Sequence, residues 1–232
     1  MKKIGIIGAM ELEVETLKSK LQNLQVTERA GMRFFAGTLN GVDTVICQSG
    51  IGKVNAALCV QIMADLFSVT HVINTGIAGS LDAALDIGDV AISTDVMYHD
   101  FHVGPFGYDW GQVPGMDVRG FPADPAMADA AEELCRAQGV NCRRGRIVSG
   151  VQFFAEQAEK EAIITHVGGL CTEMEGAAIA HAAYRNGIPV LVLRAISDKA
   201  DDSAEMDYPT FERMAAENSA RLVEALVTKI EA

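Results

Sequence analysis

Short apolar runs alternate with longer amphipathic segments along the whole chain. Continuous apolar runs bounded by glycine are typical of buried strands, whereas apolar residues that recur every three or four positions are typical of helices. The expected strands are residues 3–9, 71–76, 88–100, 145–150, 168–174 and 188–197, and the strand at 71–76 is expected to run into a glycine turn, GIAGS. The expected helices are residues 10–21, 53–67, 123–139, 155–166, 175–187 and 211–230.

This alternation favours an α/β layered domain with a mostly parallel sheet. Residues 34–50 are an exception, because two strand-like runs flank Asn40-Gly41, and Asn-Gly is a strong hairpin signal. No repeat or linker divides the chain, so we expect residues 1–232 to form one domain. Residues 101–122 form the one long irregular segment, and such loops are often functional.

The composition indicates a sizeable hydrophobic core and a negatively charged protein. Of the 232 residues, 49% are hydrophobic, which is enough to fill the interior of one large domain. The formal net charge is -12, and an acidic chain repels phosphate backbones. Nucleic acid is therefore not an expected partner.

Nothing in the sequence indicates a membrane segment, a secretion signal or a metal site. The apolar run at residues 4–9 is short and runs directly into the acidic stretch ELEVE, which favours a strand followed by a helix. No other segment is long and apolar enough to cross a bilayer. The five cysteines are scattered without metal-ligand spacing, which is typical of reduced thiols in a cytoplasmic protein. His99 and His102 are best interpreted as a solvated or hydrogen-bonded pair.

Candidate chemistry lies just after the expected strands, where sites in α/β sheets form. Three carboxylates follow three different strands: Glu13, Glu175 and Asp198. Each has a simple structural alternative, because Glu13 and Glu175 suit the first turn of a helix and Asp198 suits a turn. Arg194 is harder to explain this way, since a cation inside an apolar strand needs a carboxylate or a ligand oxygen.

Several motifs together resemble the 5′-methylthioadenosine/S-adenosylhomocysteine nucleosidase family. They are, in chain order, GIIGAMELEVE, SGIGKVNAA, NTGIAG, the pair Phe153-Phe154 after SG, EMEGAAIAH and RAISDKAD. The resemblance covers almost the whole chain. It implies a three-layer α/β/α sandwich around a mixed, mostly parallel sheet, as in nucleoside phosphorylases. It also implies a homodimer that uses no metal or redox cofactor. This enzyme would release adenine from 5′-methylthioadenosine and S-adenosylhomocysteine, and also from 5′-deoxyadenosine, by hydrolysing the N-glycosidic bond in methionine salvage.

The resemblance also implies roles for individual residues. Asp198 would protonate adenine N7, Glu13 would activate the attacking water, and Glu175 would bind the ribose hydroxyls. Arg194 would belong to the polar network near the water. The remaining expected substrate contacts are Met174 on the sugar, Phe153 and the backbone of Phe154 at the base, Met10, Ile51 and Tyr208 around the sugar and alkylthio group, and the nearby Ala78 and Ser197. Ile77 stands where many relatives carry serine, so a hydroxyl near the water is missing.

Residue chemistry points the same way. Cleavage of an N-glycoside passes through a cationic sugar that fixed carboxylates stabilise, and the departing base needs a proton. Three alternatives stay open: an aminofutalosine hydrolase, a purine nucleoside phosphorylase and a non-catalytic nucleoside sensor. Phosphorolysis is less favoured, because Glu13 would repel phosphate.

The loop at residues 101–122 is expected to form a two-fold interface. Its aromatic residues would be unusual on an exposed surface, although the loop could instead fold back on its own core. By resemblance, Val103 and Phe106 would reach the 5′ group of a substrate bound in the partner.

Overall fold

The computed structural model describes residues 2–153, 156–200 and 204–231. Its centre is an eleven-stranded sheet in the order β2-β3-β4-β1-β5-β11-β6-β10-β9-β7-β8. The strands are β1 (Ile4–Gly8), β2 (Gln22–Arg29), β3 (Met32–Leu39), β4 (Val42–Gln48), β5 (His71–Asn74), β6 (Ile77–Ser80), β7 (Val90–Tyr98), β8 (Phe121–Pro122), β9 (Cys142–Ser149), β10 (Cys171–Glu173) and β11 (Val190–Asp198).

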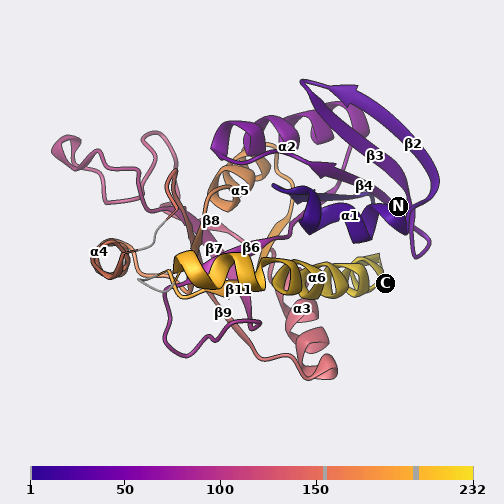
Figure 1. Cartoon of the computed structure of the whole chain (residues 1–232). Coiled ribbons are helices and arrows are strands. Elements are labelled where there is room, and N and C mark those ends of the chain that lie inside the picture. The colour runs from indigo at the N-terminus through magenta and orange to yellow at the C-terminus, as the bar shows by residue number, and fades with distance from the viewer. Residues whose placement is uncertain (1, 154–155, 201–203, 232) are drawn as a thin grey trace.

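Helices cover both faces of this sheet, which confirms the expected three-layer α/β/α sandwich (Figure 1). One layer contains α2 (Lys53–Phe67) and α5 (Gly176–Arg185), which pack against each other. The other contains α1 (Glu11–Ser19), α3 (Pro125–Gln138) and the long α6 (Ala204–Glu231). Two apolar clusters fill the spaces between the sheet and these layers. The short α4 (Gln157–His166) lies at one end of the molecule.

The sheet is mixed, with parallel pairing at its centre. Strands β4, β1, β5, β11 and β6 run parallel, so their carboxyl ends meet at one edge. The expected hairpin at Asn40-Gly41 joins β3 to β4. β11 also pairs with β7, which closes β11, β6, β10, β9 and β7 into a ring. All nine residues of β11 are buried, as its apolar sequence predicts.

Three segments differ from the sequence prediction. Residues 77–80 were expected to be a glycine turn, and this is wrong because they form β6, which pairs with both β10 and β11. β2 was not expected, because all eight of its residues are exposed and carry no buried face. The last helix starts at Ala204, before the expected residue 211, and continues through Pro209.

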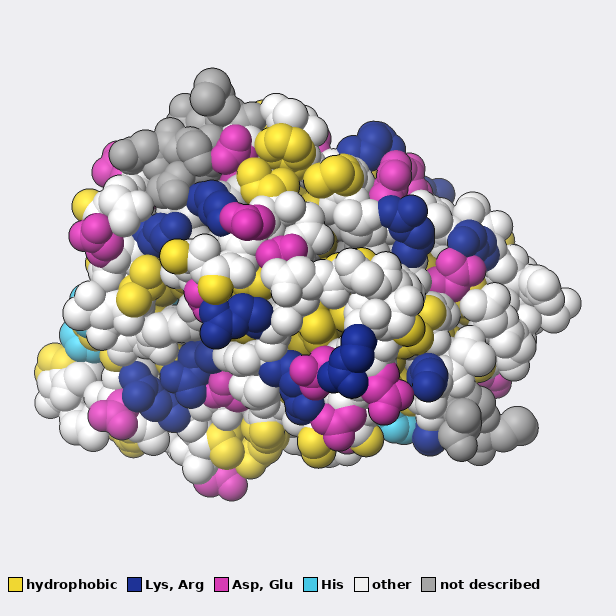
Figure 2. All heavy atoms as spheres, turned by 90° about the horizontal axis from the view of Figure 1, so that it is seen from below, with side chains coloured by type: hydrophobic (Ala, Val, Ile, Leu, Met, Phe, Trp, Pro, Cys, Tyr) yellow, Lys and Arg dark blue, Asp and Glu magenta, His cyan; other side chains and the backbone are white. Residues whose placement is uncertain are grey.

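One face of the molecule shows how the charged side chains are distributed (Figure 2). On the face shown in Figure 2, basic and acidic side chains are intermixed, and neither sign forms a continuous area. All five cysteines are free thiols. In the described part of the chain, no helix combines the length and the apolar character that a membrane crossing requires.

Candidate active site

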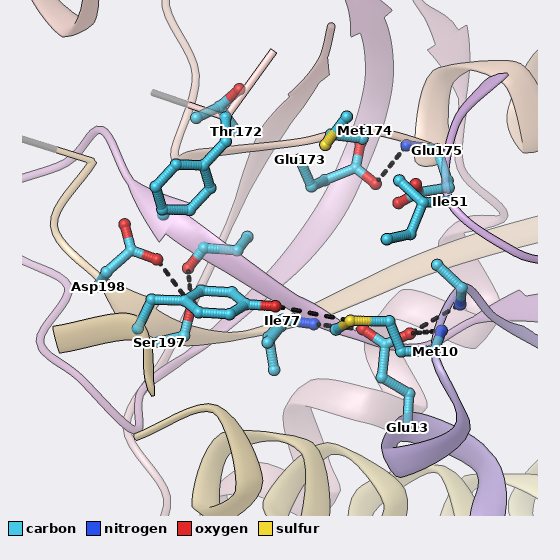
Figure 3. Close-up of a pocket in the computed structure, with 15 residues that line it drawn as sticks. Met10, Glu13, Ile51, Ile77, Thr172, Glu173, Met174, Glu175, Ser197 and Asp198 are labelled. Carbon is cyan, nitrogen blue, oxygen red and sulfur yellow. Dashed lines mark hydrogen bonds between the residues drawn. The ribbon is translucent and has the colours of Figure 1, made fainter. Parts of the chain in front are cut away.

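A pocket of about 500 Å³, including its open mouth, lies at the edge where the central parallel strands end (Figure 3). Pockets of this size hold small-molecule ligands such as nucleosides. Its lining comes from segments that are far apart in the sequence: Ala9, Met10, Glu13, Ile51, Ile77, Ala78, Gly79, Phe153, Thr172, Glu173, Met174, Glu175, Ser197, Asp198 and Tyr208. The prediction that the three carboxylates lie at one sheet edge is therefore confirmed in position.

Glu13 lies in the first turn of α1, directly after β1. Its Oε2 accepts hydrogen bonds from the backbone N–H of Ala9 at 2.7 Å and of Met10 at 2.9 Å. Its Oε1 accepts from the N–H of Ile77 at 3.2 Å, so the carboxylate joins β1 to β6. Burial raises the pKa of Glu13, while Arg194 and the three N–H groups oppose this rise. A buried carboxylate with a raised pKa is a stronger base when ionised.

Glu175 is the N-cap residue of α5 and points into the same pocket. Its Oε1 accepts a hydrogen bond from the backbone N–H of Gly52 at 2.7 Å. Burial, reinforced by the nearby negative charge of Glu173, raises its pKa to about 7. Glu175 therefore gains and loses its charge near neutral pH.

Glu173, which lines the pocket, forms a buried ion pair with Arg194. Glu173 also accepts hydrogen bonds from Ser149 Oγ and from the N–H of Gly176, the latter at 2.7 Å. Arg194 donates to Asn74 Oδ1 at 2.5 Å. The partner that a cation inside an apolar strand needs is therefore Glu173. Arg194 lies behind the pocket wall rather than in it, beside Glu13.

Asp198 ends β11 after a bulge between Ile196 and Asp198. Its Oδ2 accepts a hydrogen bond from Ser197 Oγ at 2.8 Å, and its Oδ1 accepts from the N–H of Ala200 at 2.8 Å. These two donors fix the carboxyl group, which is 2% exposed. In Figure 3, Asp198 and Glu13 lie on opposite sides of the pocket, so a bound molecule can contact both.

Apolar side chains form the rest of the wall. The Phe153 ring meets the Tyr208 ring edge-on, with centroids 5.5 Å apart, and the Tyr208 hydroxyl donates to Met10 Sδ at 3.5 Å. Ile51 is half-exposed at the rim. Phe154, expected to contact the base through its backbone, lies outside the described residues.

Two expected contacts lie elsewhere in this chain. Val103 and Phe106 belong to the loop between β7 and β8, and neither lines the pocket. Ile77 does line it, and its side chain packs in an apolar cluster with Ala195, Ala215 and Ala216. The position of the missing serine is therefore part of the core.

Sequence reasoning missed Thr172 as a lining residue. It lies inside β10, and only the pairing of β10 with β6 and β9 brings it to the pocket. Ala9 is also a lining residue without a sequence signal of its own. Across the described residues, no group of three His, Cys, Asp or Glu side chains is arranged to hold a metal ion.

Comparisons with known proteins agree with this geometry. The family model described as "Phosphorylase superfamily" matches residues 3–228. A Halalkalibacterium halodurans protein named 5′-methylthioadenosine/S-adenosylhomocysteine nucleosidase is 44% identical over 231 residues, covering 99% of this chain and 100% of the relative.

Solved structures share the fold over the whole chain. The Neisseria meningitidis 5′-methylthioadenosine/S-adenosylhomocysteine nucleosidase in complex with methylthio-immucillin-A superposes with a TM-score of 0.95 at 37% identity, covering 99% of this chain and 100% of the other. Helicobacter pylori futalosine hydrolase superposes with a TM-score of 0.93 at 30% identity, covering 98% of each chain. The chain thus belongs to the phosphorylase superfamily and, within it, to the 5′-methylthioadenosine/S-adenosylhomocysteine nucleosidase family.

Proposed function

We propose that this chain hydrolyses the N-glycosidic bond of 5′-methylthioadenosine and S-adenosylhomocysteine, releasing adenine and the corresponding thioribose. The observation that carries the proposal is the convergence of Glu13, Glu175 and Asp198 on one pocket. Full-length similarity to nucleosidases of that name supports the substrate class. A cytoplasmic enzyme of methionine salvage fits this chemistry and the five free thiols.

In the proposed reaction, adenine lies on the side of the pocket that holds Asp198 and Phe153. As the bond between C1′ and N9 breaks, its electron pair moves to adenine, and the Asp198 carboxyl gives its proton to N7. Ser197 and the Ala200 N–H orient this carboxyl. A positioned general acid of this kind typically contributes ~10²–10⁴-fold to the rate.

The sugar lies between Met174, Glu175 and Glu13. A carboxylate at Glu175 accepts hydrogen bonds from the ribose hydroxyls, and Glu13 takes a proton from the water that attacks C1′. Both carboxylates are buried, and their negative charge stabilises the cationic sugar. Arg194, held by Glu173, faces Glu13 and balances part of this charge.

Phosphorolysis is disfavoured by the same charges. No lysine or arginine is among the described residues that line the pocket, whereas four carboxylates are. A phosphate nucleophile needs cationic partners. Incubation of the protein with methylthioadenosine, with and without phosphate, tests this. We expect free methylthioribose in both cases, and a sugar 1-phosphate would contradict hydrolysis.

The second candidate is hydrolysis of aminofutalosine or a related nucleoside. The similarity to a futalosine hydrolase favours it, since one pocket can serve several 5′ substituents. Rates of adenine release from methylthioadenosine and from aminofutalosine, measured side by side, rank the two. Binding of these nucleosides without any release of adenine would instead indicate a sensor.

We also propose that a second copy of the chain completes the pocket. Phe106 is 80% exposed and Ile51, at the pocket rim, is 54% exposed. Exposed apolar side chains on α2, such as Val54 and Leu58, extend this surface from the rim. In a homodimer, Val103 and Phe106 of each copy would contact the 5′ group bound in the other.

A further inference from the structure

Thr172 carries a buried hydroxyl that lacks a protein partner. The residue is 7% exposed, and its Oγ1 is buried without a hydrogen-bond partner among the described residues. Burying a hydroxyl without a hydrogen-bond partner destabilises the folded state. Native proteins seldom carry such groups unless a ligand or water satisfies them.

The position of Thr172 indicates what satisfies it. Thr172 of β10 lies directly opposite Gly79 of β6, and Gly79 also lies beside Asp198 of β11. Directly opposed residues of an antiparallel pair point to the same face. A Cβ added at Gly79 would come within 2.6 Å of Asp198 Oδ1, so the Asp198 carboxyl covers that glycine. Thr172 is therefore about one strand spacing, ~4.8 Å, from the Asp198 carboxyl on the same face.

Thr172 belongs to the base side of the pocket rather than the sugar side. It lines both the main pocket and a smaller recess formed with Gln152, Phe153 and Asp198. Figure 3 shows Thr172 and Asp198 on one side and Met10, Glu13 and Ile51 on the other. A ligand that places its base at Asp198 thus presents a base edge to Thr172.

Adenine offers one hydrogen-bonding group beside N7, the 6-amino group. In the proposed reaction, the Asp198 carboxyl is hydrogen-bonded to N7 of adenine, and Thr172 lies next to Asp198. A hydroxyl can accept a hydrogen bond from an amino group without carrying charge. Resting on the proposed function, we propose that Thr172 is a base-recognition residue whose hydroxyl accepts a hydrogen bond from the 6-amino group of the bound adenine ring.

The test compares two ligands and two variants. Thr172→Val keeps the branched shape and removes the hydroxyl, whereas Thr172→Ser keeps the hydroxyl. Dissociation constants of adenine and of unsubstituted purine, which lacks the amino group, are measured by calorimetry. In Thr172→Val the preference for adenine over purine should fall about tenfold, the equivalent of one hydrogen bond. Thr172→Ser should retain most of it, and purine should bind all three proteins equally.

Two results would overturn the proposal. If Thr172→Val keeps the full adenine preference, a water rather than the base satisfies the hydroxyl. If Thr172→Val weakens adenine and purine equally, Thr172 only packs against the ring. The ligand-free melting temperature of Thr172→Val should not fall, because the variant loses an unpaired hydroxyl, and this confirms folding. If wild-type protein fails to release adenine from methylthioadenosine, the proposed function fails while the binding comparison still decides the role of Thr172.

Discussion

The carboxylates of the pocket differ in how many protein groups bind them. Glu13 accepts three backbone N–H groups, whereas the described residues give Glu175 one such donor, from Gly52. A carboxylate offers about four lone-pair positions, so Glu175 keeps most of its capacity for a ligand. This suits the binding of two sugar hydroxyls, while the more constrained Glu13 suits an oriented base.

The role of Asp198 as general acid can be tested with an isosteric change. Asp198→Asn keeps the shape of the side chain but has no acidic proton to give N7. We expect adenine release to fall by about 10²–10⁴-fold, with little change in the melting temperature. Turnover is measured by adenine formation and folding by circular dichroism. Near-normal turnover in a folded protein would assign the acid to another group.

The raised pKa of Glu175 predicts a pH dependence of stability. The pKa is about 7 in the folded chain, against an ordinary value of 4.5. Between these values the folded state binds more protons than the unfolded state, so the contribution of Glu175 to the free energy of unfolding decreases as pH rises. Glu175→Gln removes this contribution. Urea unfolding at about pH 5 and about pH 8 should show a smaller loss of stability in the variant than in the wild type.

Nucleoside binding should respond to Glu175 in the opposite direction. Sugar hydroxyls donate more strongly to a carboxylate than to a carboxylic acid, so affinity should increase as pH rises through about 7. Glu175→Gln should lower affinity and remove this increase. An unchanged pH profile of binding in the variant would show that another group titrates.

Most of this site could be predicted from the sequence, because its residues directly follow the apolar runs that predict strands. The acids and the aromatic residue were recognisable because each follows an apolar run. Thr172 was not, since threonine inside a strand is ordinary and its unpaired hydroxyl arises only from the packing of three strands.

At the scale of elements, β6 does the most to shape the site. It lies between β11 and β10, and its backbone approaches two carboxylates. A Cβ at Gly76, just before β6, would come within 2.5 Å of Glu13 Oε1, and one at Gly79 within 2.6 Å of Asp198 Oδ1. Glycine-rich sequence at this point was interpreted as a turn. The glycines instead leave room for the acids, which the local sequence does not reveal.

This arrangement predicts a loss of activity from one added methyl group. Gly79→Ala should displace Asp198 and lower adenine release at least tenfold, since small errors in the position of a catalytic group are costly. Gly187→Ala is a suitable control. Gly187 has a φ of +66° and open space around it, so alanine there should cost about 1 kcal/mol of stability through backbone strain alone. Equal activity losses in both variants would point to general destabilisation.

At the scale of the whole molecule, the alternation of strands and helices predicted the layers correctly. The sequence did not predict β2, because a two-stranded extension with every residue exposed has no apolar pattern. It also did not predict the ring that β11 closes with β7, since such pairing depends on sheet curvature rather than on local residues. The ring matters for the site, because it includes β10, which carries Glu173, ends just before Glu175 and pairs with β6.

The proposed dimer gives the prediction that belongs to the molecule as a whole. Phe106 is the most exposed large apolar side chain described, and Ile51 is half-exposed at the pocket rim, on the side away from Asp198 (Figure 3). Phe106→Ala should weaken self-association in sedimentation and raise KM for methylthioadenosine. It should affect adenosine less, because adenosine lacks the alkylthio group that Phe106 would cover.

Leu24→Ala is a matched control, because it removes an exposed apolar side chain from β2, and it should change neither self-association nor KM. Contacts of this kind act on binding and leave proton transfer untouched, so kcat should stay near the wild-type value. A wild-type protein that sediments as a monomer at micromolar concentration while fully active would contradict the dimer.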